Sequence, residues 1–109
     1  MMSPGRRLIF AACAGAVLPS ASSAVAAAHT YTVVMDKMKF GPAPAQLHKG
    51  DAIIWVNRDF LRHTATAADR SFNVDLPAGA KAKAVLTRTG TIPFVCRYHP
   101  GMRGTLVVK

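Results

Sequence analysis

Four side chains with sulfur or nitrogen donors could together bind a soft metal ion. Cys96, His99 and Met102 lie within seven residues of one another, and His63 lies upstream. A thiolate, two imidazoles and a weak thioether suit copper and match the blue-copper electron-transfer arrangement. An extended chain would spread the three C-terminal donors over about 20 Å. We therefore expect a tight turn, helped by the Pro-Gly pair 100–101, to bring them together.

Other chemistry is less compatible with these donors. Cys96 and His99 could form a nucleophile and its base, but such pairs usually need a third group to orient the base. No Asp or Asn lies beside this segment. We therefore expect a binding protein rather than an enzyme. Zinc could occupy similar donors, but the thioether of Met102 favours copper.

The N-terminal segment has the composition of a secretory signal. Basic residues precede an apolar run, Leu8–Leu18, and small residues follow it. The run is shorter than the ~20 residues that a membrane-spanning helix needs. We expect residues 1–28 to be a signal peptide, cleaved after Ala26 or Ala28. Residues 29–109 then form one exported domain, and we expect a periplasmic location.

Removal of the signal peptide on export would leave one cysteine and a smaller positive net charge. Cys96 is the only cysteine after residue 28, so it has no disulfide partner and must be inert, reactive or metal-bound. Residues 29–109 hold twelve basic and five acidic side chains, a net charge of +7. Such a charge favours acidic partners through long-range attraction. An exported domain rarely meets nucleic acid, so we expect no nucleic-acid partner.

The remaining chain has the pattern of a β-protein. No stretch shows sustained helical periodicity, and short β-branched or aromatic runs recur between turn residues. This spacing predicts an all-β, Greek-key β-sandwich of six to eight strands, with Trp55 in its core. Loops gather at the ends of a sandwich, so His63 and the Cys96 segment can share one end. The expected strands are 30–35 (with 38–40 as a continuation), 52–57, 63–67, 71–76, 81–86, 91–96 and 104–109, with 46–48 as a short edge strand.

The chain resembles the cupredoxins, the small blue copper proteins, and specifically their amicyanin branch. The resemblance covers nearly all of residues 30–109, and the two-residue gap between His99 and Met102 matches the short amicyanin loop. It implies that His63, Cys96 and His99 are equatorial ligands of one copper ion and that Met102 is the long axial ligand. The motifs that carry it are Met38-Lys39-Phe40-Gly41-Pro42, Lys49-Gly50-Asp51, Trp55-Val56-Asn57-Arg58-Asp59, His63-Thr64-Ala65-Thr66 and Cys96-x-x-His99-Pro100-x-Met102.

Two residues beside the first ligand depart from the family pattern. Arg62 stands where a proline is common, and Thr64 stands where many cupredoxins carry an asparagine that links the two ligand loops. We therefore expect weaker cross-linking between these loops.

Charged residues flank the candidate ligands. Arg62, Arg97 and Arg103 adjoin His63, Cys96 and Met102, and we hypothesise that with Pro100 they form a docking surface. Its partner would be a redox protein with an acidic surface, either a cytochrome or a periplasmic oxidoreductase. The alternative is that these arginines only aid solubility. We also expect an apolar rim, drawn from Pro44, Phe60 or Leu61, and Pro100.

The family resemblance implies that the protein carries single electrons by Cu(I)/Cu(II) cycling. A copper-handling protein, which sequesters or delivers the ion without redox turnover, would use the same ligands. We expect a monomer without a membrane span. His29 becomes the N-terminal residue if cleavage follows Ala28, but we expect no copper site there.

Overall fold

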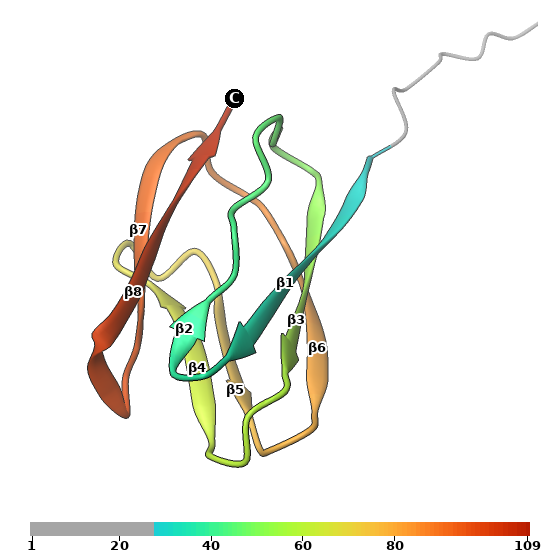
Figure 1. Ribbon diagram of the computed structural model, residues 1–109. Coiled ribbons are helices and arrows are strands. Elements are labelled where there is room, and N and C mark those ends of the chain that lie inside the picture. The colour runs from blue at the N-terminus through green and yellow to red at the C-terminus, as the bar shows by residue number, and fades with distance from the viewer. Residues whose placement is uncertain (1–27) are drawn as a thin grey trace, which may run out of the picture.

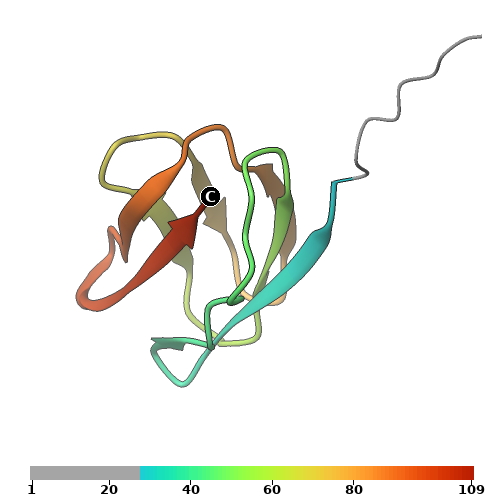
Figure 2. The ribbon, with the colours of Figure 1, turned by 90° about the horizontal axis from the view of Figure 1, so that it is seen from above.

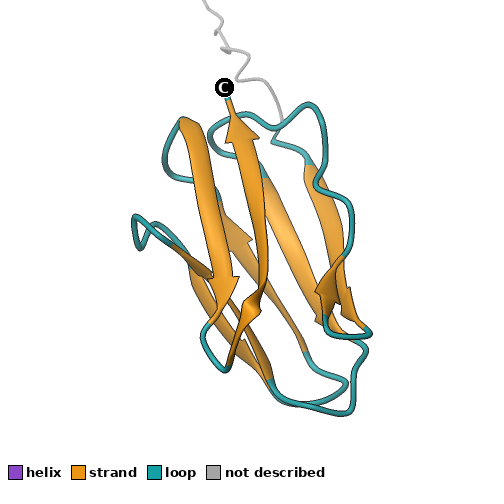
Figure 3. Ribbon diagram, turned by 60° about the vertical axis from the view of Figure 1, so that its left-hand side comes forward, coloured by secondary structure: helices purple, strands orange, loops and turns teal. Residues whose placement is uncertain are grey.

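The structure is a computed structural model that describes residues 28–109. This part of the chain contains eight strands and no helix (Figure 3), so none of it could cross a membrane as a helix. The predicted signal peptide, apart from Ala28, lies outside the described residues. The strands are β1 (Thr30–Asp36), β2 (Lys39–Phe40), β3 (Ala52–Asn57), β4 (His63–Ala67), β5 (Asn73–Leu76), β6 (Lys81–Val85), β7 (Gly90–Cys96) and β8 (His99–Val108).

The strands form two four-stranded sheets packed face to face. One has the order β2-β1-β3-β6 and the other β5-β4-β7-β8. Only β1 and β3 pair in parallel among these neighbours. The chain changes sheet three times, between β3 and β4, between β5 and β6, and between β6 and β7 (Figure 1). The predicted β-sandwich is therefore confirmed, and seen from above β7 and β8 lie on the side opposite β1 and β3 (Figure 2).

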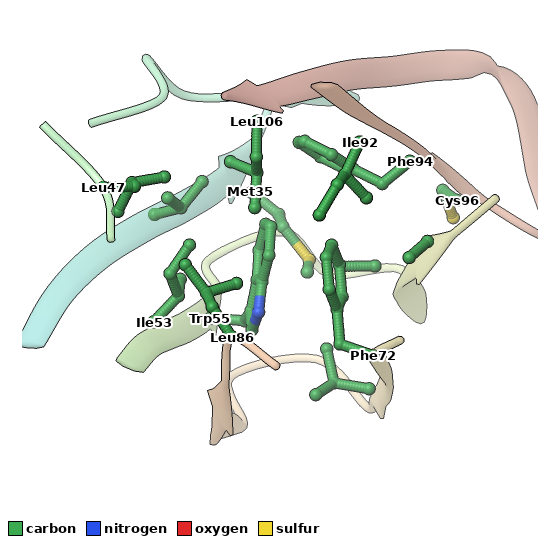
Figure 4. Close-up of a cluster of buried hydrophobic side chains, with 14 of the residues drawn as sticks. Met35, Leu47, Ile53, Trp55, Phe72, Leu86, Ile92, Phe94, Cys96 and Leu106 are labelled. Carbon is green, nitrogen blue, oxygen red and sulfur yellow. The ribbon is translucent and has the colours of Figure 1, made fainter. Parts of the chain in front are cut away.

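Aromatic side chains fill the space between the sheets. Trp55 is fully buried, stacks on Phe72 at 5.5 Å between ring centroids, and meets Phe94 edge-on at 5.2 Å. Each such pair contributes about 0.5–1.5 kcal/mol beyond the area it buries. Trp55 is thus a core residue, as predicted. Cys96 lies at the margin of the same cluster (Figure 4), so the core packs directly against the candidate site.

Several strand predictions need correction at their ends. The predicted strand 71–76 begins only at Asn73, and the predicted edge strand 46–48 is a single bridge between Leu47 and Val108. The last strand begins at residue 99 rather than 104. The expected tight turn is present at residues 97–98, but the Pro-Gly pair does not form it and lies inside β8.

Four connections meet at one end of the sandwich, at the lower part of Figure 1. They are the β1–β2 turn, the β3–β4 loop, the β5–β6 turn and the β7–β8 turn. Asn57 links two of them, because its buried side-chain amide donates to the carbonyls of Leu61, Leu76 and Pro77. Its Oδ1 also accepts the backbone N–H of Asp59. The β3–β4 loop is therefore fixed before it reaches His63.

Candidate metal centre

The structure brings the donor atoms of three of the four predicted ligands, His63, Cys96 and His99, close together. The Sγ of Cys96 lies 3.7 Å from Nδ1 of His63 and 3.5 Å from Nδ1 of His99. One donor atom from each residue lies within 4.8 Å of the others. Two imidazole nitrogens and one sulfur thus converge on a space that suits a single metal ion. His63 and Cys96 are fully buried, whereas His99 is half-buried.

The register of β7 and β8 explains why three donors from one hairpin face the same way. Val95 pairs with Arg103, but the next residue, Cys96, pairs with His99 instead of Met102. The ladder shifts by three residues, and Pro100 to Met102 form a bulge. Paired residues share a face of the sheet, so His99 faces inward with Cys96. Met102 keeps the inward face that the regular ladder would give it and is 3% exposed.

A carboxylate orients the ring of His63. Its Nε2 lies 2.7 Å from Oδ2 of Asp59, which fixes the opposite nitrogen, Nδ1, toward the sulfur. The side chain of Asp59 is 8% exposed. Such an outer hydrogen bond sets the tautomer and the orientation of a metal-binding imidazole. The sequence indicated Asp59 only as the last residue of the motif Trp55-Val56-Asn57-Arg58-Asp59, although its spacing of four residues from His63 was visible.

Asp59 also anchors the turn between β1 and β2. Its two oxygens accept the backbone N–H groups of Lys37 and Met38, each at 2.9 Å. Both of these residues have a positive φ, 52° and 63°, which the two-residue turn requires. These donors, with the His63 side chain, lower the pKa of Asp59 below its ordinary value, the Met38 amide having the largest effect. The carboxylate therefore stays charged at neutral pH.

Thr64 links the two ligand segments directly. Its backbone N–H donates to Sγ of Cys96 at 3.3 Å, and its Oγ1 accepts the backbone N–H of Arg97 at 2.8 Å. Thr64 is fully buried. Thr64 therefore cross-links the two loops, because its hydroxyl supplies the acceptor and its backbone supplies the donor.

A second link crosses the surface above the ligands. The carboxylate of Asp75 on β5 accepts the Nε–H of Arg62 and the hydroxyl of Tyr98, both at 2.8 Å. Arg62 precedes His63, and Tyr98 lies in the β7–β8 turn. Hydrogen bonding to Tyr98, with a further contribution from Arg62, lowers the pKa of Asp75. These two hydrogen bonds of Asp75 link both ligand segments to β5.

The predicted docking residues differ in what they offer a partner. The charge of Arg62 is paired with Asp75. The guanidinium of Arg103 donates twice to the carbonyl of Pro100, so it braces the bulge. Phe60 is 85% exposed and Leu61 39% exposed, which leaves apolar surface on the loop that precedes His63.

The donor set fits a single copper ion. Thiolate, imidazole and thioether are the ligands that copper prefers over harder cations. Cys96 is buried and is the one cysteine among residues 28–109, so no disulfide there competes for its sulfur. Its sulfur already accepts a backbone hydrogen bond, an outer contact of the kind that tunes copper–thiolate centres.

Comparisons with known proteins agree with this geometry. A family profile described as "Cupredoxin-like domain" matches residues 8–108. Amicyanin from Paracoccus denitrificans is 30% identical over an alignment of length 112, which covers 86% of this chain and 79% of that protein. Among solved structures, the Cu(I) form of an amicyanin variant is 28% identical, with a TM-score of 0.62 over 76% of this chain and 85% of that one. An oxidized amicyanin variant is 25% identical, with a TM-score of 0.61 over 72% and 80%. The chain therefore belongs to the cupredoxin-like family and is an amicyanin-like member of it.

Proposed function

We propose that this protein is a periplasmic type 1 blue copper protein that carries single electrons between redox partners by Cu(I)/Cu(II) cycling. The observation that carries the proposal is the convergence of His63, Cys96 and His99 within 4.8 Å. Met102, buried on the same face, is proposed as the axial ligand. The proposed signal peptide, residues 1–28, would deliver the domain to the periplasm.

The protein's part in electron transfer is to keep the ligands still. Copper, when bound, supplies the one-electron change. His63 is held by Asp59, and Cys96 is held by the Thr64 amide, so neither ligand can move without breaking a hydrogen bond. Cys96 binds as the thiolate, because coordination removes its proton. His99 is the ligand nearest to solvent and would give the electron its route to a partner.

The surface around His99 supports docking to an acidic redox protein, such as a cytochrome or a periplasmic oxidoreductase. We propose that Arg97 and Arg103 supply most of the attraction, that Arg62 adds less because Asp75 offsets it, and that Pro100 belongs to the apolar contact. Reduction by such a partner should slow as salt is added, since screening weakens steering. We propose that the protein acts as a monomer and has no enzymatic activity.

Adding Cu(II) to the purified protein tests this function. We expect an intense visible thiolate charge-transfer band that is lost in Cys96→Ser. Met102→Gln should retain copper with a changed reduction potential, and an unchanged potential would remove Met102 from the ligand set. No band in the unmodified protein would refute the proposal.

A copper-delivery protein would use the same ligands, so kinetics must separate the two functions. Reversible voltammetry and fast electron exchange support the electron carrier. Rapid transfer of Cu(I) to a metal-free acceptor, with slow electron exchange, would show delivery instead.

A further inference from the structure

A polar pocket lies on the outer face of the second sheet, beside the candidate copper site. Four residues line it: Thr66 on β4, Asn73 on β5, Arg70 in the β4–β5 turn and Arg97 in the β7–β8 turn. We call it the arginine pocket. Its volume is about 420 Å³, within the range of small-molecule sites. No role in copper ligation uses these four side chains.

The lining of the arginine pocket offers hydrogen-bond donors and positive charge. Arg70 and Arg97 contribute two guanidinium groups, and no ion pair among residues 28–109 involves either. The Oδ1 of Asn73 accepts the hydroxyl of Thr66 at 2.7 Å, which leaves its amide group to donate. No carboxylate lines the pocket. Two guanidinium groups and an amide match the oxygens of a phosphate or a carboxylate.

The neighbouring carboxylates are engaged elsewhere. Asp75 accepts from Arg62 and Tyr98, and Asp69 accepts the backbone N–H of Ser71 at 2.9 Å. Neither carboxylate forms an ion pair with the two pocket arginines, although the Arg97 charge helps to lower the pKa of Asp75.

The backbone at Arg70 adds an independent observation. Its φ is +66°, in the left-handed region, where a glycine or an asparagine is usual. The turn thus places a long cationic side chain at a position where glycine, which has no Cβ, would be less strained. Strained backbone conformations of this kind cluster at functional sites.

A hydrogen-bond chain connects the arginine pocket to the candidate copper ligand. Because Thr66 donates to Asn73, it must accept from the hydroxyl of Thr64, which lies 3.0 Å away. The Thr64 hydroxyl accepts the Arg97 amide, and the Thr64 amide donates to Sγ of Cys96. Each hydroxyl has one proton, so the direction of the chain is fixed.

We propose that the arginine pocket binds an oxoanion, a phosphate or carboxylate group, and that its occupancy is transmitted through Thr66 and Thr64 to the sulfur of Cys96. Binding itself follows from the pocket and does not depend on the proposed electron transfer. Transmission rests on the proposed copper function, because it is read at the copper–thiolate bond.

Binding is tested by amide NMR of the protein loaded with diamagnetic Cu(I), titrated with inorganic phosphate and separately with acetate. Sodium chloride keeps the ionic strength at about 0.1 M, which screens general charge effects. We expect saturable shifts at the four lining residues. Arg70→Gln should weaken binding about tenfold, the loss of one charge-assisted contact. Lys83→Gln removes an equal charge from β6 in the other sheet and should leave the affinity unchanged.

Saturation by phosphate alone would identify a phosphate site, and saturation by both would identify a general carboxylate and phosphate site. The proposal is overturned if neither anion saturates, or if the control variant weakens binding as much as Arg70→Gln. If no copper site forms, the proposed function fails, and the same titration of the metal-free protein still tests the pocket.

Transmission is tested on the Cu(II) protein. Saturating anion should shift the thiolate absorption band, and Thr66→Val should abolish that shift while the anion still binds. Transmission is refuted if the anion does not shift the absorption band of the unmodified protein, or if the shift is still seen in Thr66→Val. Binding of the anion is then judged by NMR alone.

Discussion

Replacing Asp59 by Asn tests the outer support of the candidate copper site. The carboxylate accepts three hydrogen bonds, from the Lys37 and Met38 amides and from the ring of His63. An Asn side chain has the same shape but one acceptor oxygen, and its NH₂ group would face a donor. A hydrogen bond to a charged group contributes about 1.5–3 kcal/mol. We expect the metal-free protein to lose about 2 kcal/mol, or about 10 °C in Tm for a domain of this size.

Asp59→Asn should weaken copper affinity by more than the loss of protein stability alone would explain. With its Nε2 released, His63 no longer presents Nδ1 toward Cys96 in one orientation. Loss of such an outer contact typically weakens metal affinity by about 10–100-fold. Denaturant unfolding of the metal-free protein measures the first effect, and competition with a Cu(I) chelator measures the second.

Asp36→Asn is the matched control for this experiment. Asp36 is the exposed last residue of β1, in the same hairpin that Asp59 anchors, and the substitution is chemically identical. We expect it to leave both copper affinity and stability nearly unchanged. If Asp59→Asn binds copper as tightly as Asp36→Asn does, the assigned role of the carboxylate is wrong.

Three further changes have expected outcomes. Thr64→Val should lower the free energy of unfolding by about 1–3 kcal/mol, because it leaves a turn amide without its acceptor; Thr64→Ser should recover most of this loss. Gly104→Ala places a methyl group 2.5 Å from the ring of Phe94, so it should lower the free energy of unfolding by about 1–3 kcal/mol in the same denaturant assay. As its control, Gly101→Ala places a methyl group with no atom within 4 Å and should leave the stability nearly unchanged. The pKa of Asp51 is lowered, first by the His29 amide and next by the His48 amide. The contribution of the Asp51 carboxylate to protein stability is therefore complete above pH about 4 and is lost as pH falls through the folded-state pKa. The stability difference between Asp51→Asn and the unmodified protein should therefore shrink in thermal melts below pH 4, and a constant difference would contradict this.

The strands that the sequence predicted best are those with uniform local patterns. Ala52–Asn57 and His63–Ala67 match the structure at both ends. β-branched and aromatic residues alternate or run together there, and turn residues bound them. Cys96, His99 and Met102 could be proposed as ligands from their donor types and short spacing, whereas His63, 33 residues before Cys96, was proposed because loops gather at the ends of a sandwich.

The turn in the ligand hairpin could not be predicted in the same way. Pro100 and Gly101 are strong turn formers, yet they lie in a bulge of β8. A bulge depends on the register with β7, which pairs residues that local propensity treats separately. The reversal at Arg97 and Tyr98 has no glycine, proline or asparagine to indicate it.

The supporting contacts were missed because they join residues far apart in the chain. Thr64 contacts Arg97 across 33 residues, and Asp59 contacts Lys37 across 22. The docking hypothesis met the same limit, since proximity in sequence to a ligand does not fix where a side chain points. Arg62, for example, pairs with Asp75 on β5, which leaves less of its charge for a partner.

A crystal structure of the copper-loaded protein, with the metal located by its anomalous scattering, tests the central claim most directly. We expect one copper ion bonded to Nδ1 of His63, Sγ of Cys96 and Nδ1 of His99, with Met102 on its axial side. Copper bound at His29 instead, with the Cys96 sulfur unligated, would contradict the account.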